Sequence, residues 1–180
     1  MRARLFRWLL RHMERHTPEI VRRVALQILM NVTAKAFRVR GKRLWTLRWR
    51  DGLRVYAAFT RDCSNRNIDP ERLYAASYAL GQRLRRIVGF TDNDDLRRLV
   101  FWLYGGIGIS MGGELPGEVV VSGCFFSDYY TPKQCALMSN MDSGIVGGIM
   151  GGRKLIFTQR ITEGNPCCKA RLTSEANIDE

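Results

Sequence analysis

Three times along this chain, a residue suited to a helix N-cap stands directly before a proline: Thr17-Pro18, Asp69-Pro70 and Thr131-Pro132. A Thr or Asp side chain accepts a hydrogen bond from one of the backbone N–H groups that the first helical turn leaves unsatisfied. Proline suits the first helical position because it has no N–H group to satisfy and its φ angle is already near the helical value. The three pairs therefore predict the beginnings of three helices.

The chain before Gly105 is predicted to be almost entirely helical. Apolar residues recur there at intervals of three and four, which is the spacing of one face of a helix. Only residues 42–60 fit neither the helical nor the strand period cleanly, and we interpret them as helix. The predicted helices span residues 2–16, from Thr17 to about Arg40-Gly41, 42–60, from Asp69 to about Val88, and from a capping box of Thr91 and Asp94 to about Tyr104.

The last third of the sequence has a different character. Residues 118–126 (EVVVSGCFF) are β-branched and apolar, which predicts a strand. Residues 154–161 (KLIFTQRI) alternate like a second strand, and a turn at Gly164-Asn165 returns residues 167–173 as its hairpin partner. Residues 99–113, just before this part, are interpreted as a buried helix that ends in a glycine-rich turn.

Between these strands lies the third proline-initiated helix, which begins with a capping box of Thr131 and Gln134. We expect this helix to loosen at Gly144, Gly147 and Gly148, because glycine is a poor helix former. Together, the elements predict the α+β class. An N-terminal helical layer should pack on a small antiparallel sheet that is formed by the C-terminal strand, helix and hairpin.

The net charge of +12 belongs entirely to the first third of the chain. Residues 1–60 contain 15 Lys/Arg and 3 Asp/Glu, whereas residues 61–180 contain 14 of each. We therefore divide one compact domain into a basic helical region (1–60) and an α+β region with a Cys- and Gly-rich pocket (61–180). A nucleic-acid partner is not expected, because aromatic residues are sparse among the basic ones and no recognition motif occurs.

Within the basic region, Arg4, Arg7, Arg11 and Arg15 form one narrow stripe of the first predicted helix, opposite its apolar side chains. Such a helix suits an anionic membrane surface through residues 1–16. The alternative is that its apolar face packs on the domain and its arginines stay in water. No stretch reaches the ~20 apolar residues of a membrane span. Five cysteines without a small secreted framework indicate reduced thiols, so we expect a cytoplasmic protein that is at most peripheral to a membrane.

Four of the five cysteines lie in the last third of the chain. Cys124 ends a predicted strand and Cys135 falls in the first turn of the next helix, where the helix dipole favours the thiolate. Neighbours on a strand point to opposite faces, so only one of Cys167 and Cys168 can join a shared site, and we choose Cys168. Asp142 lies two helical turns after Cys135 and therefore on the same face. These side chains are predicted to converge on one pocket.

Other interpretations of these residues stay open. Free cysteine is among the most buried residue types, so each thiol can also be a small apolar filler of the core. No CxxC pair occurs, and we predict no metal site. The only histidines are His12 and His16 on the first helix, so Asp128 and Asp142 are further candidates for proton transfer. The glycine clusters lack a nucleotide-binding fingerprint, and no cofactor is predicted.

The pattern of Cys124, Cys135 and Asp142, followed by KLIFTQRITEGNPCCKARL, resembles the L-2-amino-thiazoline-4-carboxylic acid hydrolase-like family. In that family, a strand with an Arg-Thr-type stretch is followed by a glycine turn and a final Cys-containing strand. The same ending is similar to the 4-vinyl reductase domain, a small-molecule-binding module. The pair Lys169-Ala170 departs from the acidic–aromatic pair that follows the final cysteine in the family. The residues that match the layout are Arg160, Thr162, Gly164 and Cys168.

The resemblance implies a small-molecule hydrolase that acts on a C–N bond of a thiazoline or a similar amidine-like substrate. Arg160 would then hold a substrate carboxylate. The alternative is a non-catalytic small-molecule-binding or sensor module that uses the same pocket. The implied catalytic residues are Cys124, Cys135, Asp142 and Cys168, and the implied substrate-binding residues are Arg160, Thr162 and Asp128.

Overall fold

The computed structural model of the chain describes residues 2–13, 17–66 and 68–173, and it confirms the predicted α+β class. The helices in these residues are α1 (Arg2–Met13), α2 (Glu19–Ala36), α3 (Trp49–Ser64), α4 (Pro70–Val88), α5 (Asn93–Gly106) and α6 (Pro132–Met150). The strands are β1 (Ile109–Gly113), β2 (Glu118–Cys124), β3 (Lys154–Gln159) and β4 (Cys168–Thr173), with short 3-10 helices η1 (Phe125–Asp128) and η2 (Ile161–Glu163).

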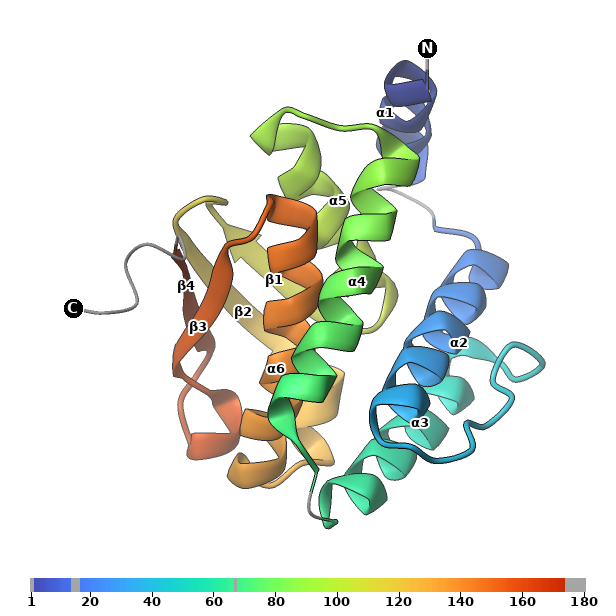
Figure 1. Cartoon of the computed structure of the whole chain (residues 1–180), viewed down its shortest axis with the longest axis vertical. Helices are drawn as coiled ribbons and strands as arrows, with labels where there is room; N and C mark the ends of the chain where they lie inside the picture. Colours follow the sequence, from blue (N-terminus) through green and yellow to red (C-terminus); the bar gives the residue numbers. More distant parts are fainter. Residues whose placement is uncertain (1, 14–16, 67, 174–180) are drawn as a thin grey trace.

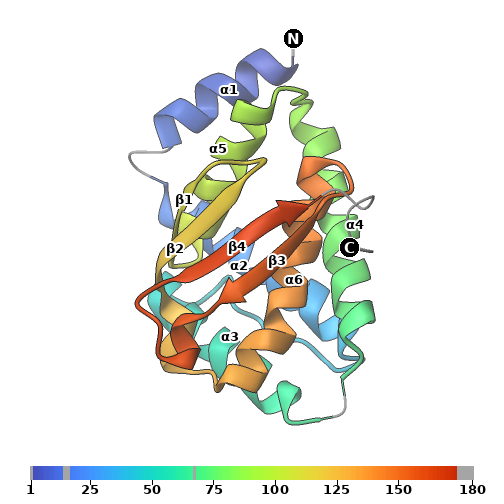
Figure 2. The same cartoon turned by 90° about the vertical axis from the view of Figure 1, so that its left-hand side faces the viewer.

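The four strands form one antiparallel sheet in the order β1-β2-β4-β3. Figure 1 shows α6 between this sheet and α4, with α2 and α3 farther from the sheet. In Figure 2 the sheet faces the viewer and the helices lie behind it. Inward side chains such as Val119 and Ala170 are buried, whereas Ser122 and Arg171 on the outer face are exposed. The buried apolar residues form one continuous cluster, from Leu10 to Leu172.

Small residues hold α6 directly against α4. A Cβ atom at Gly81 would stand 2.3 Å from the carbonyl oxygen of Ile145, and one at Gly144 would stand 2.5 Å from that of Tyr74. Neither position has room for a side chain, so the two helices pack backbone to backbone. The glycines of α6 are thus contact points and not helix breakers. The predicted loosening is wrong at all three positions, Gly144, Gly147 and Gly148, because α6 continues to Met150.

A helix begins at or directly after each of the three prolines, and two of the three predicted N-caps are confirmed. The Asp69 side chain accepts a hydrogen bond from the first turn of α4, and Thr131 forms the expected capping box at the start of α6. Thr17 does not cap α2, and that prediction is wrong. Its hydroxyl group donates to the carbonyl oxygen of Met13 and accepts a hydrogen bond from the Trp102 indole at 3.0 Å. The Thr17 hydroxyl group therefore makes a tertiary hydrogen bond with Trp102 in place of the predicted cap.

The predicted capping box at the start of α5 is also wrong, by one residue. Asp92 is the N-cap in place of Thr91, and its carboxylate accepts hydrogen bonds from the backbone N–H groups of Asp94 and Asp95. Asp and Thr are both good N-cap residues, so the local sequence offered two adjacent choices. The helix itself follows as predicted and ends at Gly106.

Two helix boundaries and one strand also differ from the prediction. α2 ends at Ala36 instead of near Arg40, and the helix predicted over residues 42–60 begins only at Trp49. The strand Ile109–Gly113 was predicted as part of a glycine-rich turn. It carries little strand propensity of its own and forms because β2 lies beside it as a hydrogen-bonded partner.

The first helix packs on α5, and its arginines do not all face water. Leu10 is buried, and the Arg7 guanidinium group forms an ion pair with the Asp95 carboxylate. Residues 14–16, which include Arg15 of the predicted stripe, lie outside the described residues. None of the helices in the described part of the chain is both long and apolar enough to span a bilayer.

Candidate functional site

A small pocket opens between α6, η1 and the β3–β4 hairpin, with a volume of about 50 Å³. This is room for a few water molecules or a few non-hydrogen atoms of a ligand. Most of its wall is apolar, and the polar groups are few. The lining residues are Tyr56, Ile107, Ile109, Cys124, Phe126, Ser127, Tyr130, Cys135, Met138, Met141, Asp142, Ile161, Thr162 and Cys168.

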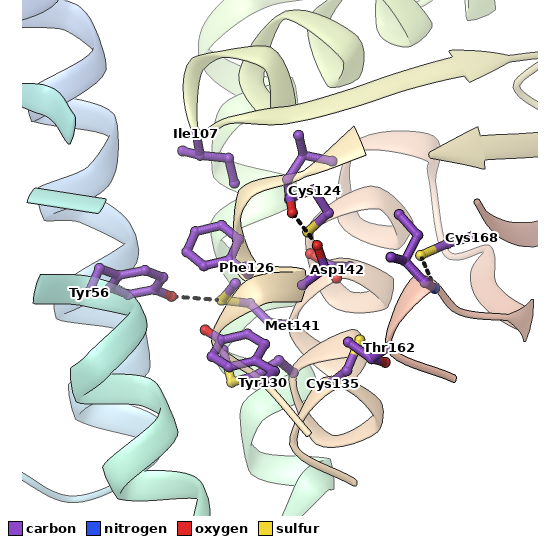
Figure 3. Close-up of a pocket in the computed structure, with 14 residues that line it drawn as sticks. Tyr56, Ile107, Cys124, Phe126, Tyr130, Cys135, Met141, Asp142, Thr162 and Cys168 are labelled. Carbon is purple, nitrogen blue, oxygen red and sulfur yellow. Dashed lines mark hydrogen bonds between the residues drawn. The ribbon is translucent and has the colours of Figure 1, made fainter. Parts of the chain in front are cut away.

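Residues that the sequence places far apart come together around this pocket (Figure 3). Cys124 comes from the end of β2, Cys135 and Asp142 come from α6, Thr162 from η2 and Cys168 from the start of β4. The Cys124 thiol lies beside the Asp142 carboxyl group, and Thr162 lies beside Cys135. The three predicted thiols therefore line one cavity.

A β-bulge turns Cys124 toward the pocket. Strict alternation along β2 would place Cys124 on the opposite face from Val121, which is buried. The register of β1 with β2 shifts between the pairs Ile109–Cys124 and Met111–Val121, and Ser122 is the additional residue. One extra residue moves the following side chain to the other face of the sheet. Cys124 and Ile109 consequently both line the pocket.

Two residues of the predicted set, Asp128 and Arg160, lie outside the pocket lining. Asp128 is exposed at the end of η1. Arg160 donates hydrogen bonds to Glu163 at 3.2 Å and to Ser139 at 3.4 Å, so its guanidinium group is already engaged. Cys167 accepts a hydrogen bond from a side-chain amide on β3, whereas its neighbour Cys168 lines the pocket. Arg160 could contact a ligand only after its present partners are released.

Asp142 carries the only carboxyl group among the described residues that line the pocket. The Tyr104 hydroxyl group donates a hydrogen bond to its Oδ1 atom at 3.1 Å. Burial raises the pKa of Asp142 from 3.8 to about 6, and the Tyr104 hydrogen bond opposes this rise because it stabilises the carboxylate. Burial also raises the pKa of Tyr104 well above its ordinary value, so the phenol keeps its proton and remains a donor.

The pocket thiols are neutral at physiological pH. Burial raises the pKa of Cys124 to about 12, and it also raises the pKa of Cys135 and of Cys168. The nearby Asp142 carboxylate adds to each rise. The expectation of a Cys135 thiolate at the start of α6 is therefore wrong, because burial raises the pKa of this thiol. A neutral thiol is a poor nucleophile.

Aromatic residues that sequence reasoning missed close one side of the pocket. The predicted strand stops at Cys124, and η1 then carries Phe126 inward and leads to Tyr130. The Tyr56 hydroxyl group contacts the Met141 sulfur at 3.3 Å, so α3 meets α6 here. The run FFSDYY after the strand was the available signal, because so many aromatic rings in six residues need a shared place to pack.

The pocket offers hydrogen-bonding groups, among them the Asp142 carboxyl group and the Thr162 hydroxyl group. Within the described residues, no three His, Cys, Asp or Glu side chains lie close enough together to hold a metal ion. The Thr162 hydroxyl group is buried and has Cys135 as its neighbour. No protein-family model and no curated protein sequence matches this chain.

Proposed function

We propose that this chain binds a small organic molecule in the pocket, with a hydrogen-bond-donating group of the ligand facing Asp142. The observation that carries the proposal is a single carboxyl group at the wall of an otherwise largely apolar cavity. Ligand sites commonly combine apolar walls with a few polar groups that fix orientation. The protein would then be a ligand-binding or sensor module, as its similarity to the 4-vinyl reductase domain implies.

The ligand class follows from the charge of Asp142. Above a pH of about 6 this group is a carboxylate, because its pKa is about 6. A carboxylate in an apolar wall is best satisfied by a cationic N–H donor, such as an amidine or an amine. The enclosed volume of about 50 Å³ matches a compact headgroup of this kind. A thiazoline carrying an amino group has this chemistry, in agreement with the family resemblance.

The test is calorimetric titration with 2-aminothiazoline-4-carboxylic acid and with simple amidines. We expect saturable binding by the wild type and a loss of at least tenfold in affinity in Asp142→Asn. Asp128→Asn is the matched control, because Asp128 is exposed and lies outside the pocket. Equal affinities for the wild type and Asp142→Asn would remove Asp142 from the binding site.

Hydrolysis of a C–N bond is a second candidate function, and the specific observation in its favour is a carboxyl group whose pKa of about 6 suits a general base. Asp142 would take a proton from water as the water oxygen attacks the amidine carbon. The C–N bond then breaks, and Asp142 returns the proton to the departing nitrogen. The thiols would position the substrate, because they are neutral and do not attack it.

Mass spectrometry separates catalysis from binding. Turnover should convert the bound thiazoline to its ring-opened product, and the rate should rise as Asp142 ionises near pH 6. Asp142→Asn should lose this activity. Binding without product, at any pH between 5 and 8, would select the binding module over the hydrolase.

A peripheral membrane role for α1 is a third candidate, because two large apolar side chains stand in water on this basic helix. Leu5 is 57% exposed and Trp8 is 56% exposed, and Arg4 and Arg11 beside them are also exposed. Aromatic and aliphatic residues flanked by arginines suit an anionic bilayer surface and a cytoplasmic location. Residues 14–16 of the proposed membrane segment lie outside the described residues.

Vesicle sedimentation tests the membrane role. The double variant Leu5→Ala/Trp8→Ala should lose most of its binding to anionic vesicles. Ile156→Ala is the control, since Ile156 is 44% exposed on the open face of the sheet. Equal sedimentation of the two variants would show that α1 does not anchor the protein to these vesicles.

A further inference from the structure

A second, larger cavity lies where α2 and α3 begin, and it shares no lining residue with the pocket described above. It is a groove of about 730 Å³. Four of its described lining residues are arginines, and these supply the positive charge of the groove. The lining residues are Thr17, Pro18, Glu19, Arg22, Arg48, Trp49, Arg50, Asp51 and Arg54.

The two carboxylates of the groove already have partners. Glu19 accepts a hydrogen bond from the backbone N–H group of Trp49 at 3.2 Å and lies 3.8 Å from the Arg23 guanidinium group. Asp51 pairs with Arg54 at 3.2 Å. Their charges are therefore largely offset. The other three arginines of the groove have no carboxylate partner within the part of the chain that the structure describes: Arg22, Arg48 and Arg50.

Trp49 fixes the position of one of these free cations. Its indole N–H group donates to the carbonyl oxygen of Gly106 at 2.7 Å, which anchors the ring. The Arg22 guanidinium group stacks over this ring, 4.8 Å from its centroid. The Nε atom of Arg22 is buried and makes no hydrogen bond within the described residues. A buried N–H donor of a cation without an acceptor is costly. Arg22 also lines the groove, so an anion bound there can accept hydrogen bonds from the other N–H groups of its guanidinium group.

We propose that this groove binds a phosphate-bearing anion, either a soluble phosphate compound or a lipid headgroup. Guanidinium groups present paired N–H donors that match the oxygens of a phosphate, and several of them together suit a multiply charged group. The groove also lies at the N-terminal ends of both α2 and α3, where helix dipoles add positive potential. Its volume exceeds that of one phosphate, so a diphosphate or a phosphate ester fits it.

Isothermal titration with inorganic pyrophosphate at low salt tests the site. The double variant Arg48→Ala/Arg50→Ala removes two exposed arginines, so its fold should be unaffected. Arg83→Ala/Arg86→Ala is the matched control, because it removes the same charge from exposed positions on α4. We expect the groove variant to bind pyrophosphate at least tenfold more weakly than the wild type, and the control to stay within twofold of it.

Two outcomes would overturn the proposal. One is the absence of saturable pyrophosphate binding by the wild type. The other is an equal loss of affinity in both double variants, since this would show attraction to the overall positive charge and no defined site. Added salt should weaken the binding, because solvent-exposed charges are screened.

Vesicles distinguish the two sources of phosphate. If phosphatidylcholine vesicles with phosphatidic acid sediment the wild type, and pyrophosphate or Arg48→Ala/Arg50→Ala abolishes this, the ligand is a lipid headgroup. If pyrophosphate binds and these vesicles do not, the ligand is a soluble phosphate compound.

Discussion

The Tyr104 hydroxyl group donates a hydrogen bond to the Asp142 carboxyl group at 3.1 Å, and this bond joins the last turn of α5 to the middle of α6. It places a single acidic group at the edge of a small cavity and gives it one neutral donor. The cavity and this pair of residues together define what the pocket can recognise. The same pair makes the stability and chemistry of the protein depend on pH near 6.

The stability of the protein should depend on pH through Asp142. Its pKa is about 6 in the folded state, above the ordinary 3.8. Protonation of Asp142 therefore stabilises the folded state, and this contribution to the free energy of unfolding is fully present below about pH 4. About 3 kcal/mol of it is lost as the pH rises from about 4 through 6. Asp142→Asn cannot ionise, so at pH 7.5 it should be more stable than the wild type by about 1–3 kcal/mol. Urea unfolding at pH 4 and 7.5 measures this, and a difference that does not change with pH would contradict it.

Removing the Tyr104 hydroxyl group should raise the pKa of Asp142 further. The Tyr104 hydrogen bond stabilises the carboxylate, so Tyr104→Phe should titrate above a pH of about 6. Carbon-13 NMR of the aspartate carboxyl groups follows this titration directly. Tyr130→Phe is the control, because the Tyr130 hydroxyl group bonds to Thr60 and not to Asp142. If both variants shift the titration of Asp142 equally, the hydrogen bond from Tyr104 does not determine its pKa.

The pocket thiols should react slowly with alkylating agents. With a pKa of about 12, Cys124 holds roughly three thousandfold less thiolate at pH 7.5 than a free cysteine of pKa about 8.5. Asp142→Asn should speed alkylation of Cys124, Cys135 and Cys168, because it removes a negative charge that opposes their ionisation. Peptide mass spectrometry after timed iodoacetamide treatment gives the rates. Fast labelling of Cys124 in the wild type would refute a buried neutral thiol.

The backbone contact between α4 and α6 should not tolerate one added methyl group. Gly81→Ala places a Cβ atom against the Ile145 carbonyl group, and we expect a loss of about 2–3 kcal/mol or more. Gly105→Ala is the control, because no atom lies within 4 Å of its new Cβ atom and alanine favours a helix by about 0.5–1 kcal/mol over glycine. Chemical denaturation of both variants measures the difference. A stability loss of similar size in both would contradict the contact.

Features that depend on neighbouring residues were predicted from the sequence, whereas features that depend on contacts between distant residues were not. Asp69 and Thr131 cap helices as expected, since their partners lie within three residues. Thr17 fails to do so because Trp102, distant in sequence, takes its hydroxyl group as an acceptor. The strand Ile109–Gly113 depends on its neighbour β2 for its hydrogen bonds, and the glycine-rich segment carried no such signal.

The candidate site shows the same division. The hairpin fold predicts the meeting of Cys168 with α6, and the periodicity of α6 places Cys135 and Asp142 on one face. Cys124 joins them only because of the β-bulge at Ser122, and the pattern EVVVSGCFF does not predict this bulge. Tyr104 could not be chosen from sequence, because nothing near the end of α5 distinguishes it from the other apolar residues there.

The most direct test of ligand binding uses methionine methyl groups as reporters. Met138 and Met141 line the pocket, whereas Met30 and Met111 do not. With carbon-13-labelled methionine methyl groups, a titration series of small amidines, amines and aminothiazolines should shift the Met138 and Met141 signals saturably and leave the other two in place. The same shifts should disappear in Asp142→Asn. If no compound of these classes moves the Met138 and Met141 signals, the pocket does not bind this kind of molecule and the proposed function is wrong.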